Sequence, residues 1–270
     1  MLKRAITGAF FVALLVGAML WHEYALASIF FIATLLGLME FYRITEEEDL
    51  EVQKIYGLFL GLASYIIIVL SGLSILEAKF TILIIPLVMF TYVIELYRKK
   101  NKPFRNLSYK LLGLLYISAP LALLNCFGFL HGDGNTYTYE PVLGFFILIW
   151  INDTMAYLTG MTMGKTLLFK RISPKKTWEG TIGGGVFTLI AAYVLSLFFD
   201  SLTLIDWLFI AAIIVTFGSL GDLIESMLKR SLNIKDSGKL LPGHGGILDR
   251  FDAVFISSPL ILTYLVLVYT

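Results

Sequence analysis

The chain has 270 residues, of which 58% are hydrophobic and 15% are charged, and its formal net charge is +1 at pH 7. Soluble domains carry roughly 25% charged residues, so this composition excludes an ordinary soluble fold. A mean hydropathy of +0.82 points to a membrane protein, and we expect no nucleic-acid partner. A single cysteine, Cys126, excludes an intramolecular disulfide and a thiolate metal cluster.

Apolar segments recur along the whole chain, each near the ~20 residues that a spanning helix needs. Backbone groups find no water in hydrocarbon, and the alternation of a membrane barrel is absent, so these segments are predicted helices. The first follows Lys3 and Arg4, but it lacks a signal-peptide cleavage site and leads directly into the second. The sequence predicts an all-α polytopic membrane protein with about nine transmembrane helices, at 5–21, 24–41, 56–76, 80–97, 109–130, 141–159, 181–199, 207–226 and 252–269.

The basic residues predict the orientation of these helices. With the N-terminus in the cytoplasm, every lysine and arginine except Lys79 falls in a cytoplasmic segment, as the positive-inside rule requires. The C-terminus is then outside. We expect two units: residues 1–107 with helices one to four, and residues 108–270 with helices five to nine. The second unit carries the polar chemistry at its cytoplasmic face.

The first polar cluster is WINDTMAYLTGMTMGKT, residues 150–166. Asp153, Ala156, Tyr157 and Gly160 are spaced to lie on one helix face, and an ionisable residue within a span is functional by default. The alternative is that Asp153 lies at the wet end of the helix and pairs with a lysine. The stretch GMTMGKT resembles a P-loop but is one residue short and follows a helix, so we reject that interpretation.

The second cluster is KRISPKKTWEGTIGGG, residues 170–185. Ser173-Pro174 predicts a helix start or a turn, and the lysines that follow are candidates to bind phosphate. Their alternative role is to anchor the topology at the membrane surface. The glycines at 180, 183, 184 and 185 have the spacing of close helix packing.

The third cluster spans residues 218–253. Asp222, Glu225, Ser226 and Lys229 share one helix face. A carboxylate that faced lipid would cost ~2.5–3.5 kcal/mol, so this face must turn to protein, water or metal. Farther along, a glycine-rich turn leads to acidic and basic residues where the ninth helix begins.

Carboxylates without a matching set of Cys or His favour a hard cation such as Mg²⁺, which often recruits substrate phosphates. Interspersed Lys and Arg would hold the remaining phosphate charge, and glycine lets a backbone approach an anion closely. These features together predict a metal-assisted phosphate site at the inner membrane face.

The stretch SMLKRSLNIKDSGKLLPGHGGILDRFDA, residues 226–253, resembles the signature of the phosphatidate cytidylyltransferases, also called CDP-diacylglycerol synthases. The pattern S-x-x-K-R, then K-D and H-G-G-x-x-D-R-x-D, is met without departure. The stretches NDTMAY and SPKKTWEG resemble further family features, whereas the first four spans match only in being hydrophobic. The matching signature residues are Ser226, Lys229, Arg230, Lys235, Asp236, His244, Gly245, Gly246, Asp249, Arg250 and Asp252.

The resemblance implies that CTP and phosphatidic acid react, with Mg²⁺ alone or with a second cation beside it, to give CDP-diacylglycerol and pyrophosphate. It implies a bacterial inner-membrane enzyme whose site faces the cytoplasm, and a homodimer is possible. We expect Asp222, Lys229 and Asp249 to be catalytic, Asp222 and Asp249 to bind metal, and Asp153, Asp236 and Asp252 to be reserve ligands. The candidates for binding substrate or phosphate are Asp153, Ser173, Lys175, Lys176, Ser226, Arg230, Asp236, His244 and Arg250.

Two alternatives stay open at this point. One is a CTP-dependent enzyme that acts on another lipid phosphate or on a polyprenol. The other is an ion-coupled transporter that uses Asp153, Asp222 and Glu225. Transporter sites lie near the bilayer midplane, between broken helices and inverted repeats, whereas these acids lie near the predicted inner face and no repeat is evident.

Overall fold

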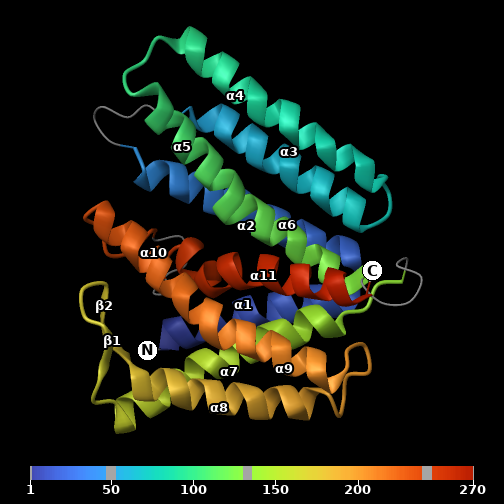
Figure 1. The fold of residues 1–270 in the computed structure, drawn as a ribbon, viewed down its shortest axis with the longest axis vertical. Coiled ribbons are helices and arrows are strands. Elements are labelled where there is room, and N and C mark those ends of the chain that lie inside the picture. The colour runs from blue at the N-terminus through green and yellow to red at the C-terminus, as the bar shows by residue number, and fades with distance from the viewer. Residues whose placement is uncertain (1, 47–52, 130–135, 239–244, 270) are drawn as a thin grey trace.

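The computed structural model describes residues 2–46, 53–129, 136–238 and 245–269. In this part of the chain it confirms an all-α polytopic architecture (Figure 1). Eight of the described helical segments are long and apolar enough to cross a membrane, and α1 contributes a shorter apolar stretch, Thr7–Trp21. These nine segments correspond to the nine predicted spans.

Five of the segments form the N-terminal part of the bundle. Helices α1 (Leu2–Trp21), α2 (Glu23–Ile44) and α3 (Lys54–Gly72) come first. A 3-10 turn, η1 (Ala78–Leu83), then leads into α4 (Ile84–Arg98). The fifth segment consists of α5 (Pro103–Gly113), the π-helical η2 (Leu114–Ser118), α6 (Ala119–Leu124) and the 3-10 turn η3 (Asn125–Phe129). The expected unit boundary after residue 107 therefore falls inside α5.

The remaining four segments carry the predicted site. They are α7 (Glu140–Met163), α8 (Trp178–Leu195), the segment of α9 (Leu204–Ile213), η4 (Ile214–Gly218) and α10 (Ser219–Ser231), and α11 (Leu248–Tyr269). The π-helical η4 lies directly before α10. Single π-turns within helices are frequent at functional sites, and this one precedes the turn that carries Asp222.

A two-stranded antiparallel hairpin joins α7 to α8. Its strands are β1 (Leu167–Phe169) and β2 (Ser173–Thr177). The expectation of a helix start or turn at Ser173-Pro174 was therefore wrong, because these residues begin a strand. Helix α8 starts only at Trp178, where the Thr177 side chain accepts a hydrogen bond from the Gly180 N–H at 3.2 Å. The rejected P-loop residues Lys165 and Thr166 donate their backbone N–H groups to Glu179, each at 3.1 Å.

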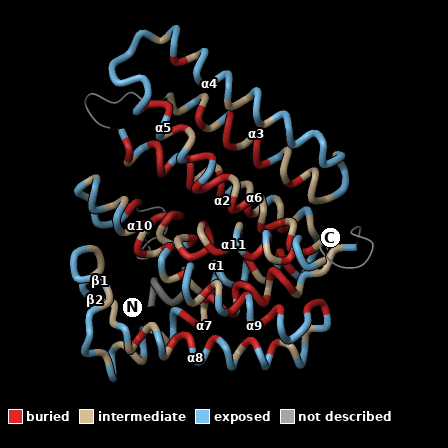
Figure 2. The backbone as a smooth tube through the Cα atoms, in the orientation of Figure 1, coloured by how far each residue is buried: buried red, intermediate tan, exposed pale blue. Residues whose placement is uncertain are grey.

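Helix α11 runs through the middle of the bundle, with α3, α4 and α5 on one side and α7, α8 and α9 on the other (Figure 1). Phe251 of α11 meets Phe11 of α1 and Phe30 of α2, with ring centroids 6.0 and 6.2 Å apart. Burial is greatest along α2, α6 and α11, whereas α4 and the outer side of α8 are largely exposed (Figure 2). The exposed residues of α4 and α8 are mostly apolar, as a surface that faces lipid requires.

The glycines at the start of α8 bring this helix against α7. A Cβ at Gly184 would lie 2.9 Å from the Ala156 Cβ and 2.9 Å from the Asn152 carbonyl oxygen. A Cβ at Gly183 would lie 2.6 Å from the Thr159 side chain. The glycine spacing therefore serves close helix packing, which fixes Asp153 of α7 beside the hairpin and α8.

Helix α4 is fastened to α5 by a buried ionic cluster. Glu95 accepts from Lys110 Nζ at 2.7 Å, from Asn106 at 2.8 Å and from Arg98 at 3.0 Å. Lys110 has no solvent exposure. In hydrocarbon or protein interior such charges are stable only when paired, so this cluster holds a peripheral helix onto the bundle.

Candidate functional site

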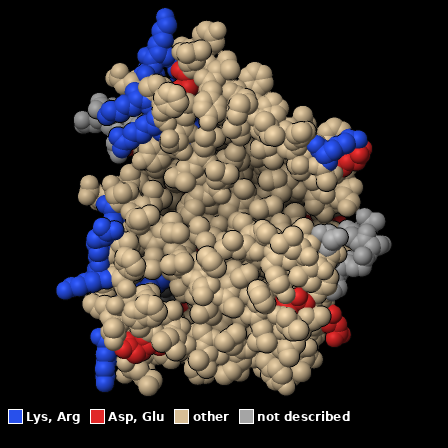
Figure 3. Space-filling view, viewed as in Figure 1, with Lys and Arg blue, Asp and Glu red and all other residues tan. Residues whose placement is uncertain are grey.

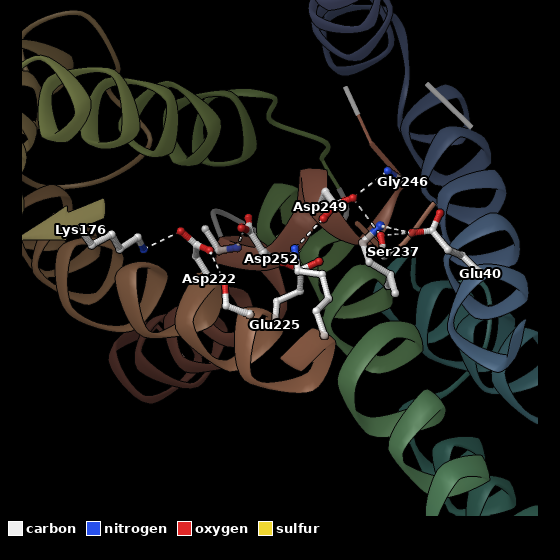
Figure 4. Close-up of polar contacts among 12 residues, drawn as sticks. Glu40, Lys176, Asp222, Glu225, Ser237, Gly246, Asp249 and Asp252 are labelled. Atoms are coloured by element: carbon white, nitrogen blue, oxygen red, sulfur yellow. Dashed lines mark hydrogen bonds and ion pairs between the residues drawn. The ribbon is translucent and has the colours of Figure 1, made fainter. Parts of the chain in front are cut away.

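Helices α10 and α11 bring three carboxylates together near one end of the bundle, those of Asp222, Glu225 and Asp252, which we call the carboxylate group. Among the described residues, Asp222, Glu225 and Asp252 each offer an oxygen, and these oxygens lie within 4.8 Å of one another (Figure 4). Asp222 and Glu225 are one turn apart on α10, and Asp252 faces them from α11. Gly221 makes this approach possible, because a Cβ there would collide with the Asp252 carbonyl oxygen.

The hairpin supplies a cation to this carboxylate group. Lys176 of β2 lies 2.6 Å from Asp222 Oδ2 and also donates to the Ser219 carbonyl oxygen at 3.3 Å. The other Asp222 oxygen accepts from the Ser226 hydroxyl at 3.4 Å. Two expected phosphate-site residues, Lys176 and Ser226, therefore contact the carboxylate that sequence reasoning placed at the centre of the site.

Glu225 is the most deeply buried of the three acids, with 1% of its surface exposed. Its Oε2 lies 2.5 Å from Lys229 Nζ, whereas its Oε1 is buried without a hydrogen-bond partner. The same ammonium lies 2.6 Å from Asp249 Oδ1. Lys229 thus joins a member of the carboxylate group on α10 to the first turn of α11.

Asp249 lies outside the carboxylate group. Its Oδ1 accepts from Lys229, and its Oδ2 accepts from the Gly246 N–H at 2.8 Å and the Ser237 hydroxyl at 3.0 Å. We expected Asp222 and Asp249 to share a metal ion, but the structure groups Asp222 with Asp252. The physical reason is helix packing, because Gly221 lets α10 approach the backbone at Asp252 closely, whereas Asp249, one turn earlier, is contacted by the long side chain of Lys229.

Two cavities share Asp153 and Asp252 in their linings. The first has a volume of about 360 Å³, lies between α7, α8, β2 and α10, and includes Lys175, Lys176 and Asp222 in its lining. The second has a volume of about 270 Å³, lies between α1, α7 and α11, and is lined by both shared aspartates, by Asp249 and Arg250, and by apolar side chains. Asp153 lines both cavities, beside the carboxylates of α10 and α11, and it remains a candidate for binding substrate.

The other expected residues are more scattered. Ser173 is the first residue of β2, Arg230 is exposed on α10, and Asp236 is exposed in the segment after that helix. The linings of the two cavities do not include Ser173, Arg230 or Asp236, as far as the chain is described. His244 lies outside the described residues.

The carboxylate group has the chemistry of a cation site. Its donors are all oxygens, which suits a hard divalent cation, and the buried Glu225 Oε1 has an unused acceptor. The neighbouring Tyr116 is 8% exposed, and its hydroxyl has no hydrogen-bond partner within the described structure. A buried polar atom without a partner is costly, so these residues fit a bound metal ion better than an empty ion-pair network.

Sequence reasoning missed two residues of this region, Ser237, which contacts Asp249, and Glu40 of α2. Glu40 is the more distant of the two in the chain. It is 6% exposed and contacts the segment that leads into α11. The signal was present, because an acid inside an otherwise apolar span is functional by default. The site residues were expected only in the second unit, which holds the last five helices, so the acid of the second helix was not considered.

The fold and site define a polytopic helical membrane protein with a carboxylate and ammonium site between its last helices. Residues 2–268 match the family described as the cytidylyltransferase family, and the chain therefore belongs to that family.

Curated relatives named phosphatidate cytidylyltransferase are similar over part of the chain. The protein of Staphylococcus saprophyticus is 46% identical over 138 residues, covering 48% of this chain and 53% of the relative. Those of Staphylococcus haemolyticus and Staphylococcus aureus strain COL are 47% and 43% identical over 133 and 139 residues. These matches cover 48% of this chain in each case, and 49% and 53% of the relatives. The chain thus spans about half the length of the curated relatives it matches.

Proposed function

We propose that this chain transfers the cytidylyl group of CTP to phosphatidic acid, giving CDP-diacylglycerol and pyrophosphate. The observation that carries the proposal is the carboxylate group of Asp222, Glu225 and Asp252 beside Lys176 and Lys229. Membership of the cytidylyltransferase family supports the nucleotide substrate, and the name of the relatives, phosphatidate cytidylyltransferase, supports the lipid phosphate.

The reaction needs no strong base from the protein. An anionic phosphate oxygen of the lipid attacks the α-phosphorus of CTP, a new P–O bond forms, and the bond to the β-phosphate oxygen breaks to release pyrophosphate. What the chain must supply is in-line positioning and neutralisation of charge.

Asp222 and Asp252 are the residues we propose to hold Mg²⁺, with Glu225 and its unused oxygen as a third ligand. The bound cation would neutralise phosphate charge and help to orient the two substrates. Lys175 and Lys176, at the first cavity, would attract the triphosphate from the aqueous side. Arg250, at the second cavity, would meet the lipid phosphate.

We assign Lys229 and Asp249 a different role from the one expected. Lys229 bridges Glu225 and Asp249 at 2.5 and 2.6 Å, and both Asp249 oxygens accept hydrogen bonds, Oδ1 from Lys229 and Oδ2 from the Gly246 N–H and the Ser237 hydroxyl. We therefore propose that Asp249 positions Lys229, and that Lys229 balances the charge of Glu225 beside the metal ligands.

The orientation of the site is also part of the proposal. Helices α1 and α11 begin at the end of the bundle where the hairpin and the end of α10 lie, and both end at the opposite side (Figure 1). In the view of Figure 3, basic side chains gather at the end of the bundle that carries the hairpin, over the α4–α5 junction, α10 and the hairpin itself. This charge asymmetry supports a site that faces the cytoplasm, where CTP is available.

The test is a transfer assay with purified chain and CTP labelled at the α-phosphate or, in a parallel arm, at the γ-phosphate. The acceptors are two lipid phosphates, phosphatidic acid and an ether-lipid phosphate, and one alcohol, a polyprenol. We expect label to appear in CDP-diacylglycerol with phosphatidic acid and Mg²⁺, and no transfer without Mg²⁺. Asp222→Asn and Asp252→Asn should each abolish transfer, because the amide keeps the size of the side chain but removes the charge that the cation needs.

Asp200→Asn is the matched control, since Asp200 is an exposed acid between α8 and α9, and it should retain normal transfer. Label on another acceptor, with none on phosphatidic acid, would replace the proposed substrate. Near-normal transfer by both site variants would remove the carboxylate group from the mechanism.

A further inference from the structure

The buried carboxylate of Glu40 holds the segment that begins α11. Its Oε2 accepts from the Ile247 N–H at 2.9 Å, and its Oε1 accepts from the Leu248 N–H at 3.4 Å and from the Ser237 hydroxyl. The first N–H groups of a helix have no partner inside the helix and carry partial positive charge. Glu40 therefore supplies, from α2, an anionic cap for the start of α11, in addition to Asp249 of the first turn of α11, which accepts the Gly246 N–H.

Two glycines of the signature region pack directly against this carboxylate. A Cβ at Gly238 would lie 2.7 Å from Glu40 Oε2, and a Cβ at Gly246 would collide with the Glu40 carboxylate. Sequence reasoning assigned the glycines of this loop to the close approach of a phosphate. The anion that Gly238 and Gly246 admit is instead a side chain of the protein itself.

The contacts continue from Glu40 to the carboxylate group without a gap. Ser237, which is 2% exposed, contacts both Glu40 and Asp249 through its hydroxyl. Asp249 holds Lys229, and Lys229 holds Glu225 (Figure 4). A hydroxyl has one hydrogen, so Ser237 donates it to one of the two carboxylates at a time and ties their positions together.

Arg43 strengthens the same connection from one turn farther along α2. Its guanidinium donates to the Ser237 carbonyl oxygen at 3.2 Å. Helix α2 thus forms hydrogen bonds with both the side chain and the backbone of Ser237. Residues about 200 positions apart in the chain are joined here, and α2 becomes part of the support of the site.

We propose that Glu40 is a positioning residue of the active site: it fixes residues 237, 238 and 246–248 against α2 and thereby sets Asp249 and Lys229 in place. The effect on catalysis rests on the proposed function. A displacement near 1 Å at a reacting centre can cost about 100-fold in rate, so a loosened Asp249 should reduce turnover without removing a group that touches substrate.

Glu40→Gln is the informative variant. Both carboxylate oxygens face hydrogen-bond donors, and the amide replaces one acceptor with an NH₂ group that must face an N–H or the Ser237 hydroxyl. Glu95→Gln is the matched control, because Glu95 is also a buried carboxylate with three donors but lies in the α4–α5 cluster. Both variants should lose stability, and we expect only Glu40→Gln to lower kcat, by at least tenfold.

Amide hydrogen exchange separates this inference from the proposed function, because it needs no turnover. Peptides that cover residues 245–250 should exchange at least tenfold faster in Glu40→Gln and at the wild-type rate in Glu95→Gln. If the wild-type chain transferred no cytidylyl group, the proposed function would fail while this measurement still decided the inference. Unchanged exchange in Glu40→Gln would overturn it.

Ser237→Ala tests the connection without altering α2, and so it serves even if Glu40→Gln cannot be purified in folded form. We expect kcat to fall at least tenfold while the unfolding temperature stays near that of the wild type. In the double variant with Glu40→Gln, the two losses should combine to less than their product, because both act through Asp249. Normal turnover in Ser237→Ala, or fully multiplicative losses, would overturn the proposal.

Discussion

Replacement of Lys229 by methionine tests the centre of the site most directly. Its ammonium lies between Glu225 and Asp249, and the three side chains have exposed fractions of only 13%, 2% and 13%. Methionine keeps most of the apolar stem but removes the charge. Two buried carboxylates would then face each other, beside Asp222 and Asp252, without the cation that now separates them.

The expected cost follows from that geometry. Removing one partner of a buried ion pair destabilises a protein by about 3–5 kcal/mol, because the remaining charge is left without compensation. We expect Lys229→Met to lower the free energy of unfolding by about this amount in a detergent-based unfolding assay, and to abolish cytidylyl transfer. Lys100→Ala, at an exposed position after α4, should change stability by less than about 0.5 kcal/mol and leave transfer normal.

A second substitution separates stability from chemistry. Lys229→Met combined with Glu225→Gln removes one of the uncompensated charges, so it should recover much of the lost stability while transfer stays low. The measurements are chemical unfolding and labelled CTP transfer on the same preparations. Recovery of transfer in the double variant would refute a need for the ammonium in the chemistry, and a fully stable Lys229→Met would refute the buried ionic bridge.

Two further predictions concern the architecture. A reporter fused after Thr270 should lie outside the cytoplasm, and one inserted between α4 and α5 should lie inside. The reason is that nine spans place all basic residues except Lys79 on one side of the membrane. Both reporters on the same side would exclude this topology. Gly184→Ala should destabilise the protein by about 1–3 kcal/mol, since the new Cβ would lie 2.9 Å from Ala156. Gly17→Ala, where a Cβ meets no atom within 4 Å, should be neutral or stabilising by up to about 1 kcal/mol in the same unfolding assay.

Local sequence patterns predicted the helices and the part of the site that lies on α10. Long apolar runs determine spanning helices because the backbone has no other partner in hydrocarbon. Helical spacing placed Asp222, Glu225 and Lys229 on one face of α10, and the ion pair between Glu225 and Lys229 follows from that spacing. The sequence patterns did not predict the hairpin, because its strands have only three and five residues and show no hydrophobic alternation.

The choice between Asp249 and Asp252 could not be made from sequence. Both precede or begin the ninth predicted span, both are acidic, and they are one helical turn apart. The close contact of Gly221 with the Asp252 backbone sets Asp252 beside Asp222 and Glu225, and Asp249 pairs instead with Lys229 of α10. That contact depends on how deeply two helices approach each other, which is set by packing across the whole bundle.

Glu40 shows the same limit at longer range. Its charge within an apolar span is unusual, but no neighbouring residue in the chain indicates which groups its carboxylate contacts. Ile247 and Leu248 become its donors because α2 and the start of α11 are packed together, with Gly238 and Gly246 leaving room for the carboxylate. The sequence by itself determined which segments cross the membrane and which residue types the site contains. The tertiary structure decided which carboxylates meet, since hydrogen bonds and ion pairs act over a few ångströms and chain positions 200 residues apart reach that range only through packing.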